Sequence, residues 1–297
     1  MSRIHEALKK AALERSAQLV TELESAEVLG EIRRSVPGPL ETEVPRPQAP
    51  PRIAGSREPA PSCFGELVKR CAHPEWWPYR GSSVFGDPAA GHAGAEKFST
   101  LRSRLYQIAE ARTLRRLLLT STVAGEGKTF VAANLAQAII REPERRVLLL
   151  DADLRVPQLH AVLGAPSSPG LTDYLLGDAD ECAIIQQGLQ PNLFLIAAGR
   201  AVSNHSDLLL SKKMKHLLNY LTPIFDWVIM DSPPTLPVHD ASVLADLADG
   251  VLLVVQAGST AVDDARKAAE EFRNKNLLGV VLNQVEKSDA YIAPDYH

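Results

Sequence analysis

A glycine-rich segment that ends in Lys and Thr is the first part of the sequence with an evident chemical use. Residues 122–129 read TVAGEGKT, although the strict pattern has a glycine at position 122. In such a loop the glycines turn backbone N–H groups toward phosphate oxygens, the lysine reaches the β- and γ-phosphates, and the threonine ligates Mg²⁺. We therefore predict a site for ATP and Mg²⁺ that contains Ala124, Gly125, Glu126, Gly127, Lys128, Thr129 and Phe130.

Three carboxylates follow two other apolar segments. Asp151 and Asp153 come after VLLL at residues 147–150, and Asp231 comes after VIM at residues 228–230. A single Asp in such a place is usually a helix cap or a turn residue. Phosphoryl transfer, however, needs carboxylates beside the phosphate loop to hold Mg²⁺ and to position the nucleophile. We predict that the catalytic residues are Lys128, Asp151, Asp153 and Asp231, and that the metal ligands are Thr129, Asp151 and Asp231.

The elements around these residues predict how they come together. From residue 96 onward, short segments rich in Val, Ile and Leu alternate with helical patterns. The segments LLLTS, VLLLD, WVIMD and VLLVV are apolar throughout, as expected for parallel strands covered by helices on both faces. We predict a doubly wound, mostly parallel α/β fold of the P-loop NTPase type. In this fold, ligands bind beyond the carboxyl ends of the strands, where the loop and the three carboxylates fall.

The composition narrows the class of protein. The chain has 297 residues, 45% hydrophobic and 23% charged, as a globular protein with a substantial core would have. Its net charge of -4 gives no bulk attraction to nucleic acid, and its three cysteines form no CxxC pair. No apolar run approaches the roughly 18 residues that span a bilayer, and residues 1–10 lack the apolar core of a signal peptide. We expect a cytoplasmic protein with reduced thiols and no nucleic-acid partner.

Composition also divides the chain into segments. We predict an amphipathic helix in residues 1–30, a Pro-rich flexible linker in residues 31–92, a P-loop domain in residues 93–286, and a mobile tail in residues 287–297. The sequence leaves open whether the apolar face of the first helix docks on a partner or packs on its own domain. Trp76, Trp77 and Tyr79 are candidates for anchoring the linker to the domain.

Three motifs together resemble a known family. The segments STVAGEGKT, VLLLDADLRVP and VIMDSPP are similar to the Walker A, Walker A′ and Walker B motifs of the bacterial tyrosine kinases. The resemblance extends from about Glu96 to Asn283 and includes GLTDYLLG, NHSDLLLS and DASVLADLADGVLLVV. A DxDxR motif after the second strand is a narrow pattern, so the combination is specific.

The resemblance implies roles for individual residues. Lys128 and Thr129 match the pair that binds phosphate and Mg²⁺, and Asp231 matches the Walker B carboxylate near the metal. Asp151 and Asp153 match the Walker A′ pair, one of which orients or deprotonates the tyrosine hydroxyl; the sequence does not decide which. Asn283 resembles the position that reads the adenine edge, although an Asn that ends a strand is also an ordinary turn residue.

The resemblance also implies a function. It predicts an ATP-dependent protein-tyrosine autokinase that regulates exopolysaccharide or capsule polymerisation and export. The γ-phosphate would pass to Tyr291 and Tyr296 in the tail of a neighbouring subunit. The implied partners are other copies of the chain, a membrane-embedded regulator of polysaccharide chain length that recruits the kinase to the inner face of the membrane, and a counteracting tyrosine phosphatase.

Two departures from the family keep alternatives open. The oligomerisation motif Glu-x-x-Arg-x-x-Asn keeps Glu96 but has Ser99 and Arg102 at its other two places, which leaves ring formation undecided. One alternative is a switch ATPase of the ParA or MinD type, although that class has a signature lysine where Val123 stands. The other is a non-catalytic ATP-binding scaffold of a polysaccharide export complex, favoured by the sparse tyrosines of the tail.

Overall fold

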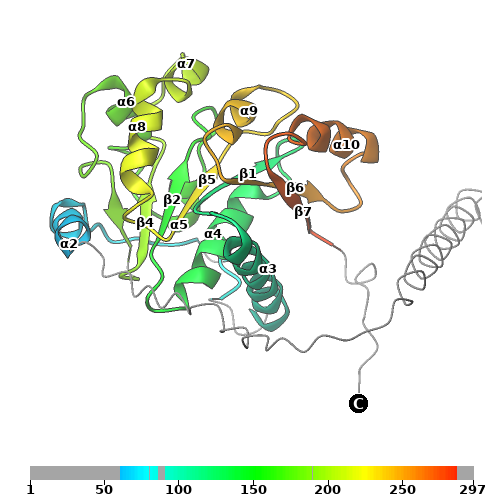
Figure 1. Cartoon of the computed structure of the whole chain (residues 1–297), viewed down its shortest axis with the longest axis horizontal. Coiled ribbons are helices and arrows are strands. Elements are labelled where there is room, and N and C mark those ends of the chain that lie inside the picture. The colour runs from blue at the N-terminus through cyan, green and yellow to red at the C-terminus, as the bar shows by residue number, and fades with distance from the viewer. Residues whose placement is uncertain (1–60, 80, 86–90, 189, 286–297) are drawn as a thin grey trace, which may run out of the picture. The chain divides into compact units, whose positions relative to one another are not determined.

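The computed structural model describes residues 61–79, 81–85, 91–188 and 190–285 (Figure 1). The amphipathic helix predicted in residues 1–30 lies outside the described residues, as does the predicted tail with Tyr291 and Tyr296. Most of the predicted linker also falls outside them.

A seven-stranded sheet forms the centre of the described domain, in the order β3-β4-β2-β5-β1-β6-β7. Every neighbouring pair is parallel except β3 and β4, which are antiparallel. The predicted mostly parallel α/β sheet is therefore confirmed. The strands are β1 Arg116–Ser121, β2 Val147–Asp151, β3 Gln186–Gln187, β4 Leu193–Ile196, β5 Trp227–Asp231, β6 Gly250–Gln256 and β7 Leu277–Asn283.

Helices cover both faces of this sheet (Figure 1). Helices α3 and α4 pack together on one face, and α8 packs on the other. The helices are α2 Pro61–Arg70, α3 Gly91–Ala111, α4 Lys128–Ile140, α5 Leu159–Leu163, α6 Leu171–Leu176, α7 His205–Leu209, α8 Lys212–Leu221, α9 Asp240–Ala245 and α10 Val262–Glu271.

The strands are apolar on both faces because each face of the sheet has its own core. In β2, Leu148 and Leu150 lie in the core that contains Met214 of α8, whereas Leu149 lies in the core that contains Leu135 of α4. All five residues of β2 are buried. Burial on both faces therefore accounts for the absence of polar alternation in VLLLD.

The register of the central strands brings the predicted catalytic groups to one edge. Strand β5 lies between β2 and β1, and Asp151 at the end of β2 is the register partner of Asp231 at the end of β5. Leu119 of β1 is the partner of Asp231 on the other side, so the phosphate loop that follows β1 begins beside the same carboxylate. Parallel pairing of these strands thus gathers the three motifs.

Residues 61–79 and 81–85, which fall in the predicted linker, form a strap that packs on the domain. The Phe64 ring in α2 contacts Phe194 of β4 edge-on, with 5.9 Å between ring centroids. Trp76 is buried, and the backbone N–H of Val84 donates to Oδ1 of Asn134 in α4 at 2.8 Å. These residues of the strap belong to the folded domain.

The aromatic residues of the strap have different environments. Trp76 is buried, as an anchoring residue would be, whereas Trp77 and Tyr79 are each 76% exposed. The backbone N–H of Trp77 donates to the carbonyl oxygen of Gly164 at 3.0 Å, directly after α5. Only the first of the three candidate anchors therefore inserts its side chain into the core.

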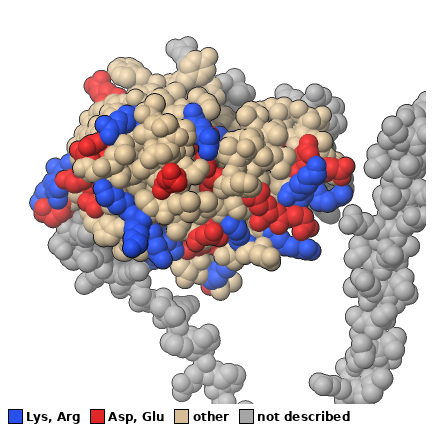
Figure 2. All heavy atoms as spheres, turned by 90° about the horizontal axis from the view of Figure 1, so that it is seen from above, with Lys and Arg blue, Asp and Glu red and all other residues tan. Residues whose placement is uncertain are grey.

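The charged side chains are mixed over the face seen in Figure 2, which looks down on the molecule from above Figure 1. Lys and Arg alternate there with Asp and Glu, and neither sign forms a continuous field. Such a surface gives little long-range steering toward a polyanion.

We expect Phe194→Ala to lower the free energy of unfolding by about 3–5 kcal/mol, because the change leaves a cavity in a packed core. Phe194 is fully buried and its ring also contacts Phe225, with 5.2 Å between centroids. Urea unfolding monitored by circular dichroism measures the loss. Leu210→Ala is the control, since Leu210 is 64% exposed and its removal should change stability by less than about 0.5 kcal/mol. Equal effects of the two substitutions would contradict the assigned core.

Candidate active site

The phosphate loop turns sharply between β1 and α4. Gly125 and Gly127 both have a φ of +89°, a left-handed conformation that residues with a Cβ rarely adopt. A Cβ on Gly127 would also lie 2.1 Å from Nδ2 of Asn283, so a side chain there would force the Asn283 amide to move. Helix α4 begins at Lys128, and its first N–H groups have no helical partners. This is the backbone arrangement that binds phosphate at a helix N-terminus.

The Glu126 side chain braces the loop from inside the protein. Its carboxylate is buried and accepts the backbone N–H groups of Val123 at 2.9 Å and Gln256 at 3.3 Å, and it also accepts the hydroxyl of Thr260. These contacts tie the phosphate loop to the end of β6. The sequence predicted Glu126 only as part of the nucleotide-binding loop, and nothing in its spacing indicated this bracing role.

Lys128 lies against the Walker A′ carboxylates. Its Nζ is 3.0 Å from Oδ2 of Asp153, and both side chains are largely buried. Burial alone would lower the pKa of Lys128, but the carboxylates of Asp231 and Asp153 outweigh it and raise the pKa above its ordinary value. Lys128 is therefore a permanent cation in this site.

Asp231 and Thr129 form the second pair. The Thr129 hydroxyl donates to Oδ2 of Asp231 at 2.6 Å, and Oδ1 of Asp231 is buried without a hydrogen-bond partner. Burial raises the pKa of Asp231 to about 6, although the Lys128 ammonium and the Thr129 hydroxyl both act in the opposite direction. A fully buried carboxylate with an unpaired oxygen is well suited to bind a cation.

Asp151 is held by backbone amides. Its Oδ2 accepts the N–H of Leu159, the first residue of α5, at 3.0 Å, and its Oδ1 accepts the N–H of Asp153 at 3.3 Å. Burial, and then the neighbouring charge of Asp231, raise the pKa of Asp151 well above its ordinary value. The structure thus brings together Lys128, Asp151, Asp153 and Asp231, the four residues predicted to be catalytic.

These groups fit ATP and Mg²⁺. The Thr129 hydroxyl and the unpaired oxygen of Asp231 are hard oxygen ligands of the kind that Mg²⁺ prefers, and the loop amides with Lys128 suit a triphosphate. Among the residues that the structure describes, no group of three or more His, Cys, Asp or Glu could hold a metal ion by itself. Magnesium would therefore take its remaining ligands from phosphate oxygens and water.

Two further polar residues join the site through the arginine of the DxDxR motif. Arg155 Nε lies 2.7 Å from Oδ2 of Asp240, and the Ser206 hydroxyl donates to Oδ1 of the same carboxylate at 2.5 Å. Asp240 is buried, yet these partners hold its pKa below the ordinary value against the opposing effect of burial. Sequence reasoning missed Asp240 because it begins α9, where an Asp is an ordinary first-turn residue.

The remaining predicted residues lie beside the loop. Asn283 ends β7 and donates from Nδ2 to the carbonyl oxygen of Glu126 at 2.8 Å. The Phe130 ring contacts Phe98 of α3, with 6.2 Å between centroids. Asn283 is thus next to the phosphate loop, and its predicted contact with adenine stays a prediction.

Comparison with known proteins places this site in a family. Residues 118–276 match the family model described as "AAA domain", which is more than half of the chain. The tyrosine-protein kinase YwqD of Bacillus subtilis is 35% identical over 191 residues, which are 64% of this chain and 80% of YwqD. The chain belongs to the bacterial tyrosine kinase family. This membership confirms the resemblance predicted from the three motifs.

Longer members of the family match over only part of their length. The putative tyrosine-protein kinase EpsB of Ralstonia nicotianae is 33% identical over 70% of this chain, but the matched part is 28% of EpsB. Within the described residues, no helix is both long enough and apolar enough to cross a membrane.

Solved structures give the same family and its wider fold. The kinase domain of the Escherichia coli tyrosine kinase ETK has a TM-score of 0.65 and 30% identity, covering 72% of this chain and 84% of that domain. The cell division ATPase MinD of Pyrococcus furiosus has a TM-score of 0.52 and 29% identity, covering 61% of this chain and 76% of MinD. The predicted P-loop NTPase fold, shared by bacterial tyrosine kinases and MinD ATPases, is confirmed.

We expect the nucleotide-free protein to lose more stability, or gain less, than its Asp231→Asn variant as the pH rises from about 4 to 6. The pKa of Asp231 is raised from 3.8 to about 6, so the folded protein keeps a proton that the unfolded chain releases. Stability from this group is therefore present below about pH 4 and lost as the pH passes 6, by on the order of 1–3 kcal/mol. Urea unfolding at half-unit pH steps measures the difference; parallel profiles for the two proteins would contradict it.

Proposed function

We propose that the chain is a protein-tyrosine kinase that transfers the γ-phosphate of ATP to tyrosines, chiefly on copies of itself. The observation that carries the proposal is the pairing of Lys128 with Asp153 at 3.0 Å beside the Thr129–Asp231 pair at 2.6 Å, in a chain of the bacterial tyrosine kinase family. Lys128 of the first pair suits the triphosphate, and Thr129 with Asp231 suits its metal.

The residues of the site have separate tasks in this reaction. The phosphate-loop amides and Lys128 hold the β- and γ-phosphates, and Thr129 with Asp231 holds Mg²⁺, which when bound withdraws charge from the phosphates. Because Lys128 carries a permanent positive charge, it stabilises the charge that develops on the transferred group.

We assign the contact with the tyrosine hydroxyl to Asp153 rather than Asp151. Both Asp151 oxygens already accept backbone N–H groups, from Leu159 and from Asp153. Asp153 accepts a backbone N–H only through Oδ1, from Val156 at 3.0 Å, while its Oδ2 faces Lys128. A lysine side chain can leave a carboxylate for an arriving γ-phosphate. That movement would free Asp153 to accept the proton of the hydroxyl, provided that it lies within hydrogen-bond reach.

The proposed substrates are Tyr291 and Tyr296 in the tail that follows β7. Tyr291 comes eight residues after Asn283, and eight extended residues span at most about 29 Å. A tail of this length suits delivery to a neighbouring subunit, so we propose a homo-oligomer. In α3, Arg102 donates to the carbonyl oxygen of Ala138 at 2.8 Å, so this residue of the altered oligomerisation motif is used inside the subunit.

The proposed cellular role follows from the family. We propose that the kinase regulates capsule or exopolysaccharide polymerisation and export, from the cytoplasm and through a membrane-embedded regulator of chain length. A counteracting phosphatase would remove the phosphate and complete a cycle, because added negative charge on the tails repels neighbouring subunits.

A switch ATPase of the MinD type is the second candidate, favoured by the TM-score of 0.52 to a MinD structure. Its signature lysine is absent, because Val123 stands at that position. Here the backbone N–H of Val123 donates to the Glu126 carboxylate, a contact internal to the subunit. The kinase is therefore the better supported function.

We expect Lys128→Met and Asp153→Asn each to reduce tail phosphorylation at least about 100-fold, since each removes a group that acts on the transferred phosphate or its acceptor. Phosphopeptide mapping by mass spectrometry after incubation with ATP and Mg²⁺ measures it, with and without a co-encoded membrane partner. Persistent phosphotyrosine in Lys128→Met would reveal a contaminating kinase. ATP hydrolysis without phosphotyrosine in the unaltered protein would favour the switch ATPase.

The tail assignment has its own test. Tyr291→Phe with Tyr296→Phe should remove most of the phosphotyrosine while leaving ATP binding unchanged, because only the acceptor hydroxyls are lost. Tyr79→Phe is the matched control, since Tyr79 is exposed and lies on the strap. Unchanged phosphotyrosine in the tail variant would place the acceptors elsewhere in the chain.

A further inference from the structure

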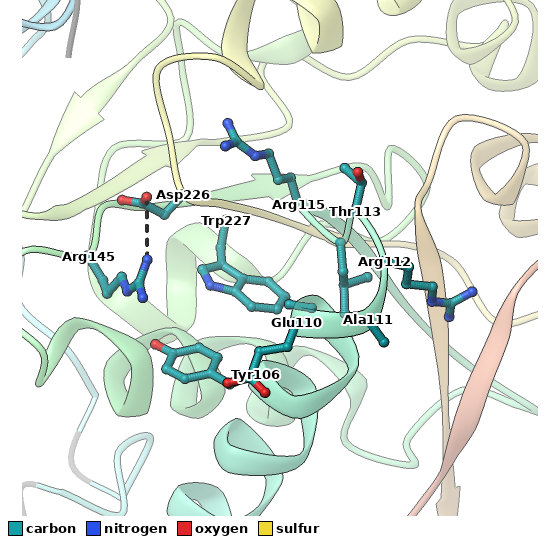
Figure 3. Close-up of a pocket in the computed structure, with 11 residues that line it drawn as sticks. Tyr106, Glu110, Ala111, Arg112, Thr113, Arg115, Arg145, Asp226 and Trp227 are labelled. Carbon is teal, nitrogen blue, oxygen red and sulfur yellow. Dashed lines mark ion pairs between the residues drawn. The ribbon is translucent and has the colours of Figure 1, made fainter. Parts of the chain in front are cut away.

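We propose that a cavity at the amino edge of the sheet binds a small phosphate-bearing anion. The cavity has a volume of about 620 Å³ and lies between the end of α3, the segment that enters β1, and the start of β5 (Figure 3). Strand β1 runs from this edge to the phosphate loop, so the cavity and the active site lie about 17 Å apart along the strand. The cavity is thus a separate site.

Arg115 in the wall of this cavity has no carboxylate partner among the described residues. Asp249 accepts the backbone N–H groups of Arg115 and Arg116 at 2.9 and 2.8 Å, and its other oxygen pairs with the Arg116 guanidinium at 3.1 Å. The Arg115 guanidinium instead donates one hydrogen bond, of 3.2 Å, to the carbonyl oxygen of Thr222. Most of its five N–H donors therefore remain available to a ligand.

Two more arginines border the cavity, whose lining also includes the carboxylates of Glu110 and Asp226. The Arg145 guanidinium lies 3.8 Å from the Asp226 carboxylate and 3.5 Å from the Glu142 carboxylate, so both of its ion pairs are long. Arg112 is exposed and makes no ion pair within the described part of the chain. Its guanidinium points away from Trp227 in Figure 3, but exposed side chains change rotamer within nanoseconds and can turn toward a ligand.

An aromatic pair gives the cavity a firm wall. The Tyr106 and Trp227 rings are stacked, with 5.9 Å between centroids and 20° between planes, and Arg145 lies 5.5 Å from the Tyr106 centroid. Burial, and then the nearby Glu142 charge, raise the pKa of Tyr106 to about 12. The Tyr106 hydroxyl therefore stays neutral and adds no negative charge that would repel an anion.

The three arginines that line the cavity favour a phosphate over a simple carboxylate, although their guanidinium groups point in different directions in Figure 3 and must turn to meet one ligand. Guanidinium groups bind both, but arginines that come from separate segments suit the three oxygens of a tetrahedral phosphate better than two coplanar oxygens. A cavity of this size is also typical of sites for small organic ligands, so a phosphomonoester has room for its organic group.

Calorimetric titration of the full chain tests the proposal. Saturation with ADP and Mg²⁺ first fills the phosphate loop, after which O-phospho-L-tyrosine and inorganic phosphate are added at constant ionic strength, with L-tyrosine and acetate as controls. We expect one saturable event for a phosphate compound, weakened at least about tenfold in Arg115→Gln because a charge-assisted hydrogen bond is lost. Tighter binding of phosphotyrosine would indicate a phosphomonoester, and equal binding would indicate free phosphate.

Two variants make the result decisive. Arg112→Gln should also weaken binding. The Arg112 side chain makes no hydrogen bond within the described part of the chain, so this variant serves if Arg115→Gln proves unstable. Lys212→Gln with Lys215→Gln removes two exposed charges from α8 and should leave binding unchanged. The proposal is overturned if neither phosphate compound saturates, or if the lysine variant weakens binding as much as the arginine variants do.

Discussion

Three buried carboxylates share one edge of the sheet with a single lysine ammonium, and the site depends on this excess of negative charge. Asp151 and Asp231 face each other as register partners, and only Asp153 lies in direct contact with Lys128. Burial, and then the neighbouring carboxylate charges, raise the pKa of both Asp151 and Asp231, and one Asp231 oxygen has no hydrogen-bond partner. Burying carboxylates without enough positive charge costs free energy, and a bound divalent cation would offset that cost.

The protein maintains this arrangement mainly with backbone groups. The N–H groups of Leu159 and Asp153 hold Asp151, and two more backbone N–H groups hold the Glu126 carboxylate that ties the phosphate loop to β6. Backbone donors are positioned by the secondary structure and lose little freedom on binding. The carboxylates are therefore oriented before any ligand arrives, which is the condition under which electrostatic stabilisation is most effective.

The fold and the central residues could be predicted from sequence because each follows from local pattern. Apolar strands imply a sheet covered on both faces, and a parallel sheet brings strand ends such as Asp151 and Asp231 together. The brace formed by Glu126 and the Arg155 contact with Asp240 could not be predicted, since both join residues far apart in the chain whose types are common in loops and helix starts. The packing of the strap could not be predicted either, because the Pro-rich composition beside it suggested a linker. The partners of Trp76 and Phe64 are far away in the sequence and come near only in the folded domain.

The strap changes where a recombinant fragment of this protein should begin. Family landmarks start near Glu96, so a fragment designed from them would omit α2 and Trp76. Without these residues, the Phe194 side of β4 loses its contact with Phe64, and apolar surface of the core becomes accessible to water. Exposed apolar surface promotes association between copies. A fragment cut at residue 93 would therefore self-associate through its damaged edge, and oligomers seen with it would say little about the assembly of the whole chain.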